Sequence, residues 1–154
     1  MFKRSYRKNI GLMAGVEFFA FLGITSFWIL FLSQNGMSLW QIGLLESIFH
    51  ATSVICEIPS GMLADRFSYK TNLYLSRIAG IVSSILMLAG QGNFWVYALA
   101  MMISAWSYNF DSGTSTAFLY DSAVEAGQKD RYLQISSFLS GVAEVTRTLG
   151  TVVA

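Results

Sequence analysis

Ionisable side chains lie inside long apolar stretches of this sequence, where they could exchange protons or bind a charged solute. These residues are Glu17, Glu57, Asp111, Glu144 and Arg147. A charged side chain at the centre of a bilayer costs about 2.5–3.5 kcal/mol on insertion scales, so such residues usually face a protein interior or a water-filled path. We therefore predict that these residues line a path for a substrate or for protons.

Polar residues recur at helical spacing, which supports a shared aqueous path. One set steps by four, three and four residues along one helix face, and consists of Glu46, His50, Ser53 and Glu57. Two further sets have similar spacing: Ser104, Tyr108, Asp111 and Ser115, and then Ser137, Ser140, Glu144, Arg147 and Thr151. The spacing of Glu144 and Arg147 allows them to pair. Alternatively, these groups hold the helices together in a static bundle, an interpretation that suits the Ser and Thr residues best.

The composition indicates that membrane-spanning helices position these side chains. Of the 154 residues, 54% are hydrophobic and 12% are charged, and the mean hydropathy is +0.51. A spanning helix needs about 20 mostly apolar residues. The sequence offers five such stretches, at residues 9–33, 39–63, 71–90, 94–120 and 132–154. We predict an all-α, polytopic membrane protein with a basic N-terminus at residues 1–8 and a transmembrane domain at residues 9–154.

The charged residues and the cysteine content exclude several other classes of protein. Ten Lys and Arg residues balance nine Asp and Glu residues, which gives no electrostatic footprint for nucleic acid. The single cysteine, Cys56, excludes an internal disulfide framework and a cysteine zinc site. No metal ligand set, nucleophile–base pair or phosphate-binding loop stands out, so we expect neither an enzyme nor a cofactor.

Basic residues between the predicted spans fix an orientation. They precede the first span, follow the second and precede the fifth, and they are Lys3, Arg4, Arg7, Lys8, Arg66, Lys70, Lys129 and Arg131. The turns after the first and third spans contain no Lys or Arg. This positive-inside bias predicts a cytoplasmic N-terminus and a multi-pass protein of the plasma (inner) membrane.

The most specific motif follows the second predicted span, from Gly61 to Lys70. It resembles the G-x-L-A-D-R-x-G-R-K loop between the second and third helices of major facilitator superfamily transporters. Gly61, Leu63, Ala64, Asp65, Arg66 and Lys70 match that loop, whereas Ser68 and Tyr69 replace its second glycine and following arginine. The alternative is a simple turn whose basic residues only enforce orientation.

A second stretch carries the same resemblance. Residues 112–122, SGTSTAFLYDS, are similar to the S-G-x-x-x-A-x-x-Y-D-S pattern that ends the fourth helix in many bacterial facilitator proteins. The resemblance implies a conformational latch at the cytoplasmic surface, formed by Gly61, Asp65, Arg66, Lys70 and Asp121. Asp121 is our candidate for the carboxylate partner in this latch, because an arginine donates to a carboxylate through a planar fork.

The resemblance implies a secondary transporter of a small solute that works by alternating access. The family fold has twelve helices in two halves, with inverted three-helix repeats in each half. This sequence corresponds to helices one to five of the N-terminal six-helix half. Thr151 follows Gly150 where the antiporter motif of helix five has proline, so symport and uniport stay open beside antiport, and proton coupling is one option.

A second hypothesis is a non-transporting membrane protein, such as a truncated or regulatory one, or a half-transporter that needs a partner. Five helices leave one wall of a transport cavity missing, so we expect transport to need the C-terminal half or an oligomeric partner. A small four-helix multidrug exporter is disfavoured, because the spans are longer and the Gly61–Lys70 loop is present.

Overall fold

A computed structural model describes residues 6–21, 27–64 and 66–153. These residues form α-helices and a short 3-10 helix, and no strand occurs among them. Within the same ranges, two helical stretches are long and apolar enough to cross a membrane, namely Leu39–Pro59 and Tyr69–Ala89. The all-α class that the sequence predicts is confirmed for the described part of the chain.

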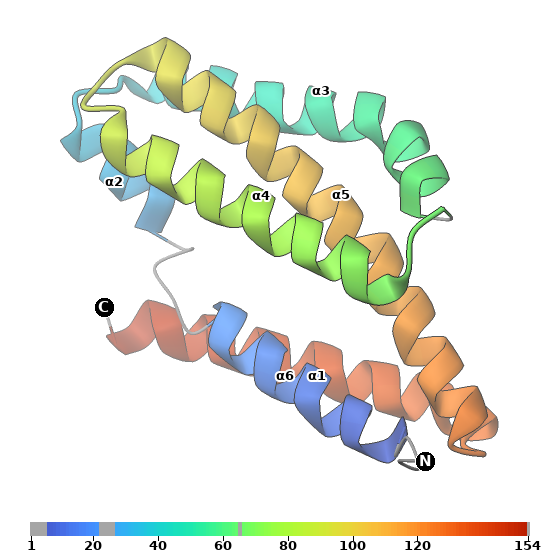
Figure 1. Ribbon diagram of the computed structural model, residues 1–154. Helices are drawn as coiled ribbons and strands as arrows, with labels where there is room; N and C mark the ends of the chain where they lie inside the picture. Colours follow the sequence, from blue (N-terminus) through green and yellow to red (C-terminus); the bar gives the residue numbers. More distant parts are fainter. Residues whose placement is uncertain (1–5, 22–26, 65, 154) are drawn as a thin grey trace. The chain divides into compact units, whose positions relative to one another are not determined.

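Figure 1 shows the helices in chain order. Their bounds are α1 Tyr6–Phe21, α2 Trp28–Gln34, α3 Leu39–Ala64, α4 Tyr69–Ala89, α5 Phe94–Glu125, the 3-10 helix η2 Lys129–Arg131 and α6 Tyr132–Val153. Helix α5 ends at Glu125 instead of the expected residue 120, because residues 121–126 contain neither Gly nor Pro and the turn comes at Gly127, which has a φ of 68°. The predicted 9–33 segment overlaps α1 and α2, and residues 22–26 between them lie outside the described residues.

The chain divides into two compact units. The first contains residues 1–28 and 117–154, in which α1 packs against α6. In this unit the side-chain amide of Asn9 donates a hydrogen bond to the hydroxyl of Ser122 (3.2 Å). The rings of Tyr120 and Tyr132 meet edge to face, with centroids 5.3 Å apart. These contacts join α1, the end of α5 and the start of α6.

The second unit, residues 29–116, is built on an antiparallel pair of helices, α4 and the first part of α5. Ser76 on α4 donates to the carbonyl of Ser107 on α5 (3.0 Å), and Ser107 donates back to the carbonyl of Ser76 (2.9 Å). Further along the pair, Ser83 donates to the carbonyl of Ala100 (2.8 Å). These side-chain to backbone bonds fix the register of the two helices.

Helix α3 runs beside α5 in the second unit, and polar side chains again make the connection. Ser53 donates to the amide oxygen of Asn109 (2.8 Å), and the amide nitrogen of Asn109 donates to the carbonyl of Ser53 (2.8 Å). The indole N–H of Trp106 donates to the sulfur of Cys56 (2.8 Å). Small polar residues of this kind commonly join apolar helices, so the packing role considered for Ser53 is confirmed.

The turn between α4 and α5 depends on the close approach of Gly90 and Tyr97. Tyr97 is fully buried, and its hydroxyl accepts a hydrogen bond from the backbone N–H of Gly92 (3.0 Å). Gly92 and Gln91 both have a positive φ, at 83° and 43°. A Cβ atom on Gly90 would overlap the Tyr97 ring, although the right-handed backbone of Gly90 itself accepts any residue.

We expect Gly90→Ala to destabilise this turn, because the added methyl group must displace the buried Tyr97 ring. Overpacking of this kind costs about 1–3 kcal/mol. Thermal unfolding followed by tryptophan fluorescence measures the loss. Gly43→Ala is the matched control, because a Cβ at Gly43 in α3 meets no atom within 4 Å. Equal unfolding temperatures for the two variants would contradict the proposed contact.

Candidate functional site

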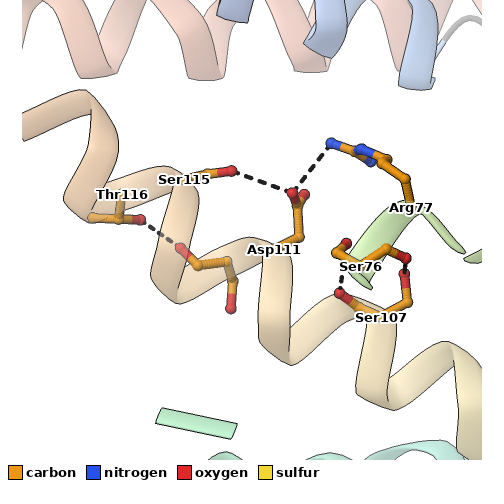
Figure 2. Close-up of polar contacts among 7 residues, drawn as sticks. Ser76, Arg77, Ser107, Asp111, Ser115 and Thr116 are labelled. Carbon is orange, nitrogen blue, oxygen red and sulfur yellow. Dashed lines mark hydrogen bonds and ion pairs between the residues drawn. The ribbon is translucent and has the colours of Figure 1, made fainter. Parts of the chain in front are cut away.

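An ion pair between α4 and α5 is the most specific polar arrangement in the second unit. Nη2 of Arg77 lies 3.1 Å from Oδ1 of Asp111. The hydroxyl of Ser115, one turn along α5, donates to the same Oδ1 (3.2 Å). Figure 2 shows both groups directed at the Asp111 carboxylate. A carboxylate thus accepts from a cation and from a neutral donor at one oxygen.

The helix register explains why Arg77 and Asp111 meet. Arg77 follows Ser76, and Asp111 lies one helical turn after Ser107, so the reciprocal Ser76–Ser107 bonds stand next to the ion pair (Figure 2). Gly80 also lies against Ser107, since a Cβ there would be 3.2 Å from the Ser107 hydroxyl. The helices approach closely at this level, which brings the long Arg77 side chain within reach of Asp111.

The pair lies well inside an apolar helix. Arg77 is the ninth residue of the stretch Tyr69–Ala89, and a rise of 1.5 Å per residue places it about 12 Å along that helix. An arginine at such a depth is costly unless it is paired or wet. Asp111 supplies such a partner for Arg77, and the side chains of Arg77 and Asp111 are 46% and 27% exposed.

Several hydrogen-bonding groups at or near the ion pair have no partner among the described contacts. A guanidinium carries five N–H donors, and the described contacts of Arg77 use only Nη2. Among those same contacts, Oδ2 of Asp111 has no partner. Thr114, which is 2% exposed and lies almost one turn from Asp111, has a buried hydroxyl without a hydrogen-bond partner in the described part of the chain.

The remaining predicted path residues are not brought to this pair by any described contact. Glu57 on α3 and Glu144 on α6 are exposed, and each takes part in an interaction of its own. The side chains of Glu17 and Arg147 lie outside the described part of the structure. The pairing of Glu144 with Arg147 therefore stays a prediction, as does the path role of all these residues.

The polar sets on α3 and α5 have different surroundings. On α3, Nε2 of His50 lies 3.2 Å from Oε1 of Glu46, and their side chains are 67% and 45% exposed. On α5, Asp111 and Ser115 share a hydrogen bond as their spacing predicts. Among the described residues, His, Cys, Asp and Glu side chains form no group of three that could hold a metal ion.

The predicted latch is described only in part. Asp65 lies outside the described residues, and Gly61 is known only as part of helix α3. Arg66, Lys70 and Asp121 are exposed, and Asp121 takes part in an interaction. Arg66 and Asp121 belong to different compact units, so their pairing stays a prediction.

Ser68 has a defined role at the position where the family loop has glycine. Its hydroxyl accepts a hydrogen bond from the backbone N–H of Thr71 (3.3 Å), and its backbone is extended, with φ −69° and ψ 151°. This is the geometry of a helix N-cap, which satisfies one of the unpaired N–H groups at a helix start. The substitution therefore starts α4 at Tyr69.

Arg77 is a site residue that the polar spacing did not reveal. The predicted polar sets join residues of one helix, and residues 71–90 contain no such set around Arg77. A useful signal was nevertheless present, because Arg77 is the single charged residue in that predicted span. A charge in an apolar helix requires a partner, and a partner on the next helix of an antiparallel pair was a natural candidate.

Comparison with known proteins gives one family. Residues 14–114, which are more than half of the 154-residue chain, match the family described as MFS_1 like family. The matched region contains Arg77, Asp111 and the loop from Gly61 to Lys70, whereas Asp121 and Glu144 lie beyond it. No curated protein and no solved structure matches the chain.

We expect the ion pair to couple α4 to α5 energetically. Arg77→Gln and Asp111→Asn each leave one charge without its partner, while the double variant leaves none. In a double-mutant cycle, the double variant should therefore be more stable than the sum of the single losses predicts, by about 0.5–3 kcal/mol. Chemical unfolding of the purified variants measures this coupling. Strictly additive losses would show that the two side chains do not interact.

Proposed function

This chain belongs to the MFS_1 like family, and from that premise we propose that it is the N-terminal part of a secondary transporter. The transporter moves a small solute across a membrane by alternating access. The Arg77–Asp111 pair carries this proposal, because ionisable groups inside apolar helices are costly and mark substrate or ion pathways.

The same proposal includes a topology. Five spans cross the plasma (inner) membrane, the N-terminus is cytoplasmic, and the loop from Arg66 to Lys70 faces the same side. Two of these spans are supported by helices that are long and apolar enough, at Leu39–Pro59 and Tyr69–Ala89. The basic residues support the orientation, because they gather in the loops assigned to the cytoplasm.

Within this transporter, Asp111 belongs to the substrate or proton path and Arg77 is its partner. Their place in apolar helices supports this assignment, because charged side chains there commonly mark a substrate or ion pathway. Glu17, Glu57, Glu144 and Arg147 are proposed for the same path on the strength of their positions in apolar segments.

The substrate path needs a second wall, which we assign to a C-terminal half or to an oligomeric partner. An immunoblot of the native membranes with an antibody against the N-terminus tests this assignment. A product of roughly 400 residues, the size that twelve spans of about 20 residues and their loops require, would support a transporter in one chain. A product of 17.1 kDa that remains monomeric in the membrane would favour the non-transporting alternative.

A second test addresses the latch at Asp121. Asp121→Asn should shift the balance between inward-open and outward-open states, because it removes the carboxylate that we assign to Arg66 or Lys70. The measurement is the rate at which an impermeant maleimide labels a cysteine introduced at Ser47, after replacement of Cys56 by serine. We expect a change of about fivefold or more, equivalent to a coupling of about 1 kcal/mol.

Glu125→Gln is the matched control for this experiment. Glu125 is also an exposed carboxylate in the last turns of α5, but it lies outside the motif. Its labelling rate should equal that of the parent. Equal rates for Asp121→Asn and the parent would remove Asp121 from the latch.

A further inference from the structure

We propose that one water molecule binds in the buried contact between α4 and α5, where it joins the hydroxyl of Thr114 to the side-chain amide of Asn72. The ligand is neutral, and the site uses neither side chain of the Arg77–Asp111 ion pair. This binding site is independent of the proposed function, because it requires no transport. Water is held there by hydrogen bonds alone.

The hydroxyl of Thr114 is the observation that carries the site. Thr114 is 2% exposed, and its Oγ1 has no hydrogen-bond partner within the described part of the chain. A hydroxyl that leaves water without gaining a new partner is costly. Buried polar side-chain atoms are for this reason nearly always bonded, either to another protein group or to an ordered water. We therefore expect a hydrogen-bonding group beside Thr114.

The helix of Thr114 does not supply this partner. Three other threonines in helices each donate to the backbone carbonyl four residues earlier, at 2.8, 2.8 and 2.9 Å, and they are Thr116, Thr146 and Thr148. Thr114 makes no such bond. Its hydroxyl is thus left for a group outside α5.

Helix α4 presents a buried polar face to α5. The buried residues of α4 are Asn72, Ser76 and Ser83, all of them polar. Ser76 and Ser83 already donate to carbonyls of α5, and Figure 2 shows Ser76 with its partner Ser107. Asn72 lies one turn before Ser76 on the same face and is 1% exposed. It is the next polar group that α4 offers to α5.

The register of the antiparallel pair brings Asn72 close to the level of Thr114. Asn72 lies four residues before Ser76, Thr114 lies seven residues after Ser107, and the two serines are bonded to each other. At a rise of 1.5 Å per residue, these steps are about 6 Å and about 10.5 Å in the same direction, so the two levels differ by about 4–5 Å. One water with two hydrogen bonds of about 2.8 Å spans such an offset.

The chemistry of the two side chains matches water better than a metal ion. A hydroxyl and an amide can each donate and accept, as water can, and an amide has room for up to four hydrogen bonds. Asn72 can therefore hold a water in addition to the interaction that it already makes. Both groups are neutral, and His, Cys, Asp and Glu side chains among the described residues form no group of three that could hold a metal ion.

The unfolding temperature of the purified protein, at its natural length, tests the site through the sign of one substitution. Thr114→Val keeps the shape of the side chain and removes only the hydroxyl. With a bound water, this change deprives the water of a partner, and we expect the unfolding temperature to fall by about 2–4 °C. A hydroxyl without any partner would instead be better replaced by a methyl group. An unchanged or raised unfolding temperature would therefore overturn the site.

Thr116→Val is the matched control, because Thr116 is exposed on the same helix and donates to its own backbone. Its unfolding temperature should stay within about 1–2 °C of the parent. If Thr114→Val does not fold, Thr114→Ser and Thr114→Ala replace it, since these two variants differ by the hydroxyl alone. The same pair of substitutions at Thr116 corrects for the higher helix propensity of alanine. After this correction the serine variant should be the more stable one, and the opposite order contradicts the site.

A crystal structure of the natural-length protein identifies the ligand directly. We expect a density peak within about 3.2 Å of Oγ1 of Thr114 in the parent and no such peak in Thr114→Val. Replacement of sodium chloride by choline chloride at equal ionic strength should leave the unfolding temperature unchanged, because the ligand is not a salt ion. A sodium-dependent unfolding temperature would overturn water as the ligand, and so would a structure in which another protein group bonds the Thr114 hydroxyl.

Discussion

The reciprocal hydrogen bonds between Ser76 and Ser107 are the interaction on which the second unit depends. Each hydroxyl donates to the backbone carbonyl of the other serine, so the two bonds together exclude a shift of α4 along α5. With this register, Ser83 meets the carbonyl of Ala100 and Arg77 meets Asp111. A slip of one residue would turn Arg77 by about 100° around α4, since a helix has 3.6 residues per turn. The ion pair therefore follows from the serine pair.

Much of the helical framework was predictable, because long apolar segments and their polar breaks are local properties of the sequence. The end of α5 was less predictable, since the polar residues Asp121, Ser122 and Glu125 remain helical before the turn at Gly127. Of the two residues in the ion pair, only Asp111 could be predicted from the sequence pattern. Asp111 lies in a polar set on its own helix, whereas its partner Arg77 comes from a neighbouring helix whose register depends on the turn around Gly90 and Tyr97.

The Gly61–Lys70 loop shows how a departure from a family pattern can be physically reasonable. Glycine at position 68 would allow a tight turn through its conformational freedom. Ser68 instead has an ordinary extended backbone and supplies a hydroxyl that caps α4. The helix thereby begins immediately after the loop, which sets the distance along α4 from the loop to Arg77. Serine in place of glycine at position 68 thus contributes to the position of Arg77 on α4.

The Arg77–Asp111 ion pair is tolerated in an apolar helix pair more easily than a single charge would be. A lone Arg77 would need water or lipid headgroups at all times, whereas the Arg77–Asp111 pair can remain in an apolar surrounding while its net charge is zero. Any event that changes one charge then requires a compensating change in the other or the arrival of a counter-ion. Removal of either side chain alone therefore leaves an uncompensated charge between the two helices.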